Sequence, residues 1–321
     1  MKRTFLSTFA ALAAAAVMIF APVPGSGQAP PAKGGAPAPG GKGGAPGGGA
    51  AKGGPNGKDG PYYQAPEVAG GPFKRGKDGK PDMTGFWTPR LNRSIFEIQG
   101  KQGSIVDPAD GMLPYKPEAL AHKNDLKKNH MFDETEAHCF QSGVPHTAYQ
   151  QFGYQIQQTP GYLAFMPEYA HSYRLIPTDN RKHIPADIKL FMGDGVGHWE
   201  GDTLVIETTN QNGLVWLDME ANFTTPNIHV VERLTMKDLN RIDYEATITD
   251  SSIYTQPFKI AGNLGRHDDP TYELMEFACH EGNIDLDHYT EGEGGRAKAA
   301  PPAAGAAPAG PAAGKGKGKQ N

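Results

Sequence analysis

Three ionisable side chains lie in the segment 229–234, which reads His-Val-Val-Glu-Arg-Leu. Side chains at every second position of a strand share a face, so His229 and Arg233 would lie on one face and Glu232 on the other. A face that lines a barrel interior then carries a charge inward, which is costly unless the charge is paired. Glu232 or His229 would act as a general acid or base if burial tuned its pKa, and Arg233 would bind a carboxylate or phosphate. These three residues are the candidate catalytic set.

Residues whose charge is opposite to that of Glu232 or Arg233 lie on neighbouring predicted strands. Arg174 is available to Glu232, while Glu207, Glu245 and Glu276 are available to Arg233. Two interpretations remain open. The first is a structural ion pair, which contributes little if it is exposed. The second is a polar cluster inside a ligand cavity.

We expect most aromatic side chains on the predicted strands to pack in the core. The functional alternative is that they form a stacking platform for a sugar ring. Polar partners on the same strands would orient such a ligand. The candidate ligand-binding residues are Tyr173, Arg174, Trp199, Trp216, Glu245 and Tyr254.

Several other chemistries lack their motifs. No G-x-S-x-G nucleophile motif occurs, and Gly193-x-Gly195-x-Gly197 has the wrong spacing for a dinucleotide fingerprint. A metal site needs several ligands that converge. The even spacing of His122, His130, His138 and His146 crosses a predicted helix and loops. We therefore predict no metal and no cofactor.

The segment Met192–Asn210 is the clearest structural element that would position these residues. It predicts a glycine-punctuated hairpin with a tight turn at Glu200-Gly201-Asp202 and a strand at Thr203–Thr209. Glycine lets the backbone take a positive φ in such turns.

Further short strands follow the same pattern of alternation and turn residues. One helix is predicted at Pro117–Asn129, because Pro117 suits a first turn and lysines stand near the end. Roughly eight to ten strands with little helix predict a mainly β fold, an antiparallel barrel or sandwich, with a lipocalin-like barrel favoured. The predicted strands are Ser94–Ile98, Tyr154–Gln158, Tyr162–Met166, His171–Ile176, Ile228–Met236, Asp243–Thr249, Ser252–Ile260 and Thr271–Cys279.

The two ends of the chain differ in composition from its body. Residues 1–27 carry Lys2 and Arg3 before an apolar run and small residues, which is typical of a signal peptide, with an uncleaved anchor as the alternative. Residues 28–77 and 292–321 are rich in Gly, Ala, Pro and Lys, and we expect a disordered linker and tail. The β domain is expected at 78–291.

Charge is distributed unevenly. Residues 61–295 hold 20 Lys and Arg against 34 Asp and Glu, a net charge of −14, whereas the ends are basic. An acidic body argues against nucleic-acid binding. The basic tails would serve as solubilising linkers or would contact an anionic envelope surface.

Two cysteines, Cys139 and Cys279, stand in a chain that is expected to be exported. Because that compartment is oxidising, we predict a disulfide, with two buried free thiols as the alternative.

The run Gly193–Val205, GDGVGHWEGDTLV, resembles the signature GD-x-VG-x-WEGDTLV of a large group of secreted bacterial proteins of unestablished function. The resemblance covers about residues 78 to 283 and implies no activity. This chain departs from the group at Asn180, where a glycine is usual, and at 211–213, where Gln-Asn-Gly replaces Phe-Asn-Asp. Other matching pieces are Gly143–Pro145, Gln157–Gly161, Trp216–Asp218, Val231–Arg233, Ile253–Phe258 and Cys279–Asn283.

These observations predict a secreted or periplasmic bacterial protein that binds a small molecule or glycan fragment in a β-barrel cavity. One alternative is an extracytoplasmic lyase, isomerase or hydrolase that works by general acid–base catalysis. The other is an envelope-associated structural protein that makes its contacts through its tails. No transmembrane span is expected after cleavage of the signal peptide.

Overall fold

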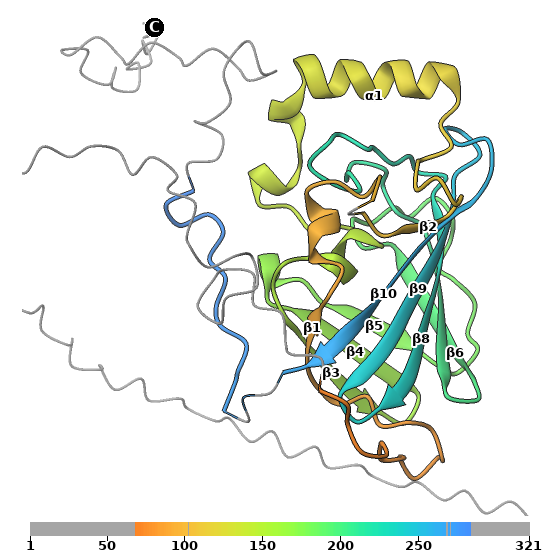
Figure 1. Cartoon of the computed structure of the whole chain (residues 1–321), viewed down its shortest axis with the longest axis vertical. Helices are drawn as coiled ribbons and strands as arrows, with labels where there is room; N and C mark the ends of the chain where they lie inside the picture. The colour runs from red at the N-terminus through yellow and green to blue at the C-terminus, as the bar shows by residue number, and fades with distance from the viewer. Residues whose placement is uncertain (1–67, 102, 268, 270, 284–321) are drawn as a thin grey trace, which may run out of the picture. The chain divides into compact units, whose positions relative to one another are not determined.

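The computed structural model describes residues 68–101, 103–267, 269 and 271–283, and its ten strands form one antiparallel sheet (Figure 1). The signal segment 1–27 and the tail 292–321 that the sequence predicts lie outside the described residues, as does most of the linker. The strands are β1 (Gly85–Pro89), β2 (Ile105–Asp107), β3 (Tyr154–Thr159), β4 (Tyr162–Pro167), β5 (Arg174–Pro177), β6 (Asp194–Glu200), β7 (Thr203–Thr209), β8 (His229–Asp238), β9 (Arg241–Thr249) and β10 (Phe258–Arg266).

The sheet is a nearly closed barrel. Its hydrogen-bonded order is β5-β4-β3-β1-β10-β9-β8-β7-β6, and β2 adds to β10. The first and last strands, β1 and β10, pair with each other, with Trp87 opposite Arg266. The two strands at the ends of this order, β5 and β6, lie close together but share no ladder. The predicted antiparallel barrel is therefore confirmed. Among the described strands, the barrel lacks backbone pairing between β5 and β6, which follow each other in the sequence.

The core follows from the period-2 pattern of the strands. Along β9 every second residue is buried, from Ile242 through Tyr244 and Ala246 to Ile248. β8 alternates in the same way, but Glu232 occupies one of its buried positions. The inner face of the barrel is therefore apolar except for a small polar cluster.

Helix α1 (Pro117–Asn129) has the bounds that the sequence predicts. Figure 1 shows it across one end of the sheet, and only Ala119 and Lys123 of this helix are buried. Five short 3-10 helices lie in the connections: η1 (Asn92–Ile95), η2 (Met131–Asp133), η3 (Glu136–His138), η4 (His146–Tyr149) and η5 (Tyr169–His171).

Four strand predictions are wrong in whole or in part. His171–Ile176 begins at the end of the 3-10 helix η5, and the strand β5 starts at Arg174. Ser94–Ile98 begins in the 3-10 helix η1, where the buried Ser94 hydroxyl donates to Ser104 Oγ at 2.7 Å. Residues 252–257 form a turn and a bend with one isolated bridge, from Tyr254 to Tyr115, and the strand β10 begins at Phe258. Thr271–Cys279 forms no strand. In each case the alternation is present, but local hydrogen bonds or the disulfide determine the backbone instead.

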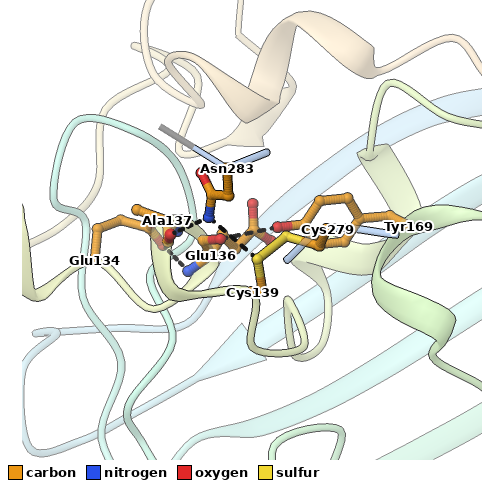
Figure 2. Close-up of a disulfide and its surroundings, with 7 residues drawn as sticks. All are labelled: Glu134, Glu136, Ala137, Cys139, Tyr169, Cys279 and Asn283. Atoms are coloured by element: carbon orange, nitrogen blue, oxygen red, sulfur yellow. Dashed lines mark hydrogen bonds between the residues drawn. A yellow bond between two sulfur atoms is a disulfide. The ribbon is translucent and has the colours of Figure 1, made fainter. Parts of the chain in front are cut away.

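The predicted disulfide between Cys139 and Cys279 is confirmed, with the two Cα atoms 5.7 Å apart. Figure 2 shows its surroundings, where Asn283 Nδ2 donates to the Ala137 carbonyl at 3.0 Å and to Cys139 Sγ at 3.2 Å. The bond joins positions 140 residues apart and ties the segment after β10 to the loops before β3. None of the helices in the described part of the chain has the length and apolar character needed to cross a membrane.

Candidate ligand site

A buried ion pair lies inside the barrel. Arg174 on β5 donates to both carboxylate oxygens of Glu232 on β8, from Nη1 at 3.1 Å and from Nη2 at 2.5 Å. Nη2 also donates to Thr208 Oγ1 at 3.3 Å, and the Tyr244 hydroxyl donates to Glu232 Oε1 at 3.0 Å. Arg174 is 7% exposed and Glu232 is 1% exposed. The predicted pairing of Arg174 with Glu232 is confirmed.

Burial and charge act in opposite directions on this pair. Burial alone lowers the pKa of the Arg174 guanidinium, but the charge of Glu232 and its hydrogen bonds outweigh that effect and raise the pKa. The arginine therefore stays charged, and each member of the pair depends on the other for compensation.

The free space beside the pair is small. It has a volume of about 20 Å³ and is lined by Thr147, Tyr154 and Phe165 together with Arg174, Glu232 and other residues. A cavity of that size holds about one water molecule, whereas small-molecule pockets measure roughly 300–1,000 Å³. The barrel centre is therefore filled by side chains, and a ligand needs another site.

The candidate catalytic residues do not converge. Glu232 faces the interior, while His229 and Arg233 lie on the outer face of β8. His229 Nε2 lies 2.7 Å from Glu207 Oε1, and Arg233 Nη2 donates to Glu200 Oε2 at 2.7 Å. Arg233 thus pairs with a residue outside the three predicted partners. The predicted alternation is present in β8, and it places Glu232 on the opposite side of the barrel wall from His229 and Arg233.

The break between β5 and β6 is sealed by side-chain packing. Ile176 on β5 is buried, and a Cβ atom at Gly195 or Gly197 of β6 would lie only 2.7 or 2.9 Å from its methyl groups. Both glycines have an ordinary strand φ, so their role here is the absence of a side chain. Of the four glycines expected in the turns of this hairpin, Gly193 and Gly201 have a positive φ, 66° and 60°, whereas Gly195 and Gly197 lie in the strand β6.

A groove lies along one end of this break, which we call the seam groove. Its volume is about 430 Å³. Arg174 belongs both to its lining and to that of the internal space, so this side chain separates the two. The lining consists of Gln141, Tyr173, Arg174, Leu175, Ile176, Lys189, Leu190, Phe191, Met192, Gly193, Asp194, Gly195 and Asn212.

Asn210 and Gln211 hold the loop that forms one wall of the seam groove. Asn210 Nδ2 donates to the carbonyls of Pro185 and Ile188 at 2.8 and 2.9 Å. The Leu190 N–H donates to the Asn210 carbonyl at 2.9 Å. The buried Gln211 side chain forms two hydrogen bonds with the backbone of Val144. The Asn210 contacts fix the connection between β5 and β6 without regular secondary structure, and the Gln211 side chain ties the adjacent backbone to the segment before β3.

The six candidate ligand-binding residues are spread over different parts of the molecule. Tyr173, which is 63% exposed, and Arg174 line the seam groove. Trp199 packs against the core, and Trp216 and Tyr254 are buried. Glu245 lies on the outer face and accepts a hydrogen bond from Lys259 Nζ at 3.2 Å. The structure therefore brings together two of the six.

Arg233 and Glu245 line a second groove, of about 460 Å³, on the outer face of β8, β9 and β10. Its charged side chains are engaged in ion pairs such as Arg233 with Glu200 and Arg241 with Asp243. The lining of this second groove contains none of the exposed large apolar side chains found among the described residues. The seam groove, by contrast, has three of them, Tyr173, Leu175 and Leu190.

Two carboxyl groups in the loops that cover the barrel end, Glu134 and Asp218, have a raised pKa. Burial, followed by the charge of Glu136, raises the pKa of Glu134 to about 7. Burial raises the pKa of Asp218 to about 6, although this carboxylate accepts hydrogen bonds from Ile98 N and Asn222 Nδ2. Both carboxylates bind backbone N–H groups, so both serve to shape loops.

Within the described ranges, no group of three or more His, Cys, Asp and Glu side chains is arranged to hold a metal ion. The residues that sequence reasoning missed are Lys189, Leu190 and Phe191 in the loop before β6. No motif marks them, and the alternation that identified the strands does not extend into this loop.

No protein-family model, curated protein or solved structure matches the chain. The resemblance of Gly193–Val205 to a group of secreted bacterial proteins therefore stays a prediction.

Proposed function

We propose that this chain binds a small organic molecule in the seam groove. The observation that carries the proposal is a groove of about 430 Å³ whose walls expose Tyr173, Leu175 and Leu190. Its size falls in the range of small-molecule sites, which combine apolar walls with a few polar groups. Gln141 and Asn212 supply polar groups here.

The seam groove replaces the barrel interior as the proposed binding place, because the internal space measures only about 20 Å³. The acid–base alternative has less support. Glu232 is buried against Arg174, and His229 and Arg233 lie on the other side of the barrel wall. The envelope-associated alternative rests on the tails, which lie outside the described residues.

We also propose that the protein works outside the cytoplasm. The charged and then apolar start of the sequence supports export. The disulfide between Cys139 and Cys279 supports an oxidising compartment.

A thermal-shift screen of the full chain tests the binding proposal, since a ligand stabilises the folded state by mass action. The compounds are sugars, aromatic acids and lipids. We expect a concentration-dependent rise in Tm for at least one class, and we expect Leu190→Glu to abolish it, because this exposed wall residue would place a charge in the groove.

The matched control is Thr247→Glu on the outer face of β9, which should keep the ligand-dependent rise. A ligand that stabilises the Leu190→Glu variant as much as the unchanged chain would place the site elsewhere. A flat response to every class would contradict the proposed function.

A further inference from the structure

The lining of the seam groove contains three charged residues, Arg174, Lys189 and Asp194. Their partners determine which of them is available to a ligand. A charge that is already bound to a partner inside the protein contributes little to recognition, because a ligand would have to displace that partner.

Arg174 and Asp194 are engaged. The Arg174 guanidinium is bound by both oxygens of Glu232 and is 7% exposed. Asp194 Oδ2 lies 2.7 Å from His183 Nδ1 and accepts the Ile184 N–H at 3.2 Å. These contacts tie Arg174 to the interior and Asp194 to the loop 178–193.

Lys189 is available. Its ammonium donates to the Pro226 carbonyl at 3.0 Å, and no carboxylate of the described residues lies within ion-pair distance. A lysine ammonium has three N–H donors, so donors remain for a ligand. The seam groove thus presents one cation without a counter-charge, and this favours an anionic group on the ligand.

The apolar part of the groove favours a ring. Phe191 stacks on Phe140, with ring centroids 5.1 Å apart and planes at 10°. The Tyr173 ring at the edge of the groove is 63% exposed. Exposed aromatic faces bind other rings by offset or edge-to-face packing.

We propose that the ligand of the seam groove is a small aromatic carboxylate, with its ring against Tyr173 and Phe191 and its carboxylate on Lys189. This inference rests on the proposed function and names its ligand class. Charge-assisted hydrogen bonds are stronger than neutral ones, so the lysine contact selects the acid over an uncharged analogue of the same shape.

The test compares naphthalene-2-carboxylate with naphthalene-2-carboxamide by isothermal titration calorimetry on the full chain. The unchanged chain should bind the carboxylate about tenfold more tightly, since a hydrogen bond to a charged group contributes about 1.5 kcal/mol or more. Lys189→Met should remove that preference. Lys237→Met, on the outer face of β8 and outside the groove, should keep it.

Equal affinity for acid and amide in the unchanged chain would overturn the inference and leave the proposed function standing. A preference that survives in Lys189→Met would also overturn it. Binding of neither probe would overturn the ligand class, whereas failure of the proposed function appears separately, as a flat compound screen.

Discussion

Ile176 packs over the backbone of Gly195, so that a Cβ atom at position 195 would lie 2.7 Å from Ile176 Cδ1. This contact joins the two strands that end the hydrogen-bonded order of the barrel. It explains why a segment that reads as a glycine-rich turn contains a strand. The glycines make room for the neighbouring strand, and the seam groove forms where that packing ends.

Gly195→Ala and Gly197→Ala should each destabilise the fold. An added methyl group in a packed position costs about 1–3 kcal/mol, and the neighbouring Ile176 is buried. Urea unfolding measures the free energy. Gly71→Ala is the control, since nothing lies within 4 Å of the added Cβ there. Equal stabilities for Gly71→Ala and Gly195→Ala would contradict the account of the barrel break.

Removal of one member of the internal ion pair should be costly. Glu232→Gln or Arg174→Met leaves a buried charge without its partner, which costs about 3–5 kcal/mol. The double variant Arg174→Met with Glu232→Leu should recover much of the loss. The exposed pair Arg233 and Glu200 is the comparison, and its removal should cost less than about 1 kcal/mol. Urea unfolding of all variants tests this, and single variants with unchanged stability would show that the pair is not buried.

The disulfide should contribute strongly to stability. In the chain-entropy view, a bond that closes a loop of 140 residues contributes about 5 kcal/mol, and native disulfides typically contribute about 2–5 kcal/mol. Tm measured by circular dichroism should fall on treatment with dithiothreitol. The variant with Ser at positions 139 and 279 should already have the lower Tm and should not respond. A Tm that is indifferent to reductant would contradict this role.

Stability should decrease as the pH rises from about 4.5 to 7 through the contributions of Glu134 and Asp218. Both carboxyl groups have a raised pKa in the folded state, about 7 and about 6. Over this window the unfolded chain has already lost the proton that the folded chain still binds, so the free energy of unfolding falls. Above the raised pKa values the decrease ends.

Urea unfolding at several pH values measures this slope. Glu134→Gln removes a titrating group and should flatten the slope relative to the unchanged chain. A slope that is identical in the two proteins would show that the Glu134 pKa is not raised by its surroundings.

Much of the fold was predictable because local physics determines it. Pro117 at the first turn and the lysines near the end set the helix bounds. The alternation along 229–234 predicts that Glu232 lies on the opposite face from His229, and the structure shows that the face of Glu232 is the buried one. The errors lie where local hydrogen bonds compete with alternation, as at Ser94, and where a covalent bond sets the path, as between Thr271 and Cys279.

The candidate site was predictable only in part. Arg174 begins the strand β5, directly after Tyr173, and the opposite charges of Arg174 and Glu232 made them candidate partners. Lys189 and Phe191 lie in a loop whose path depends on Asn210, which binds the Pro185 and Ile188 carbonyls. Such contacts between a side chain and distant backbone leave no periodic signal in the sequence.

The central claim is that a ligand binds in the seam groove, and a titration followed in the ¹H–¹⁵N correlation spectrum of the full chain tests it most directly. The titrant is the compound that raises Tm most. We predict that the largest amide shifts occur at residues 173–176 and 189–195. Shifts concentrated on the outer face of β8 to β10, around Thr235, Asp243 and Asn263, would contradict the claim and assign binding to the other groove.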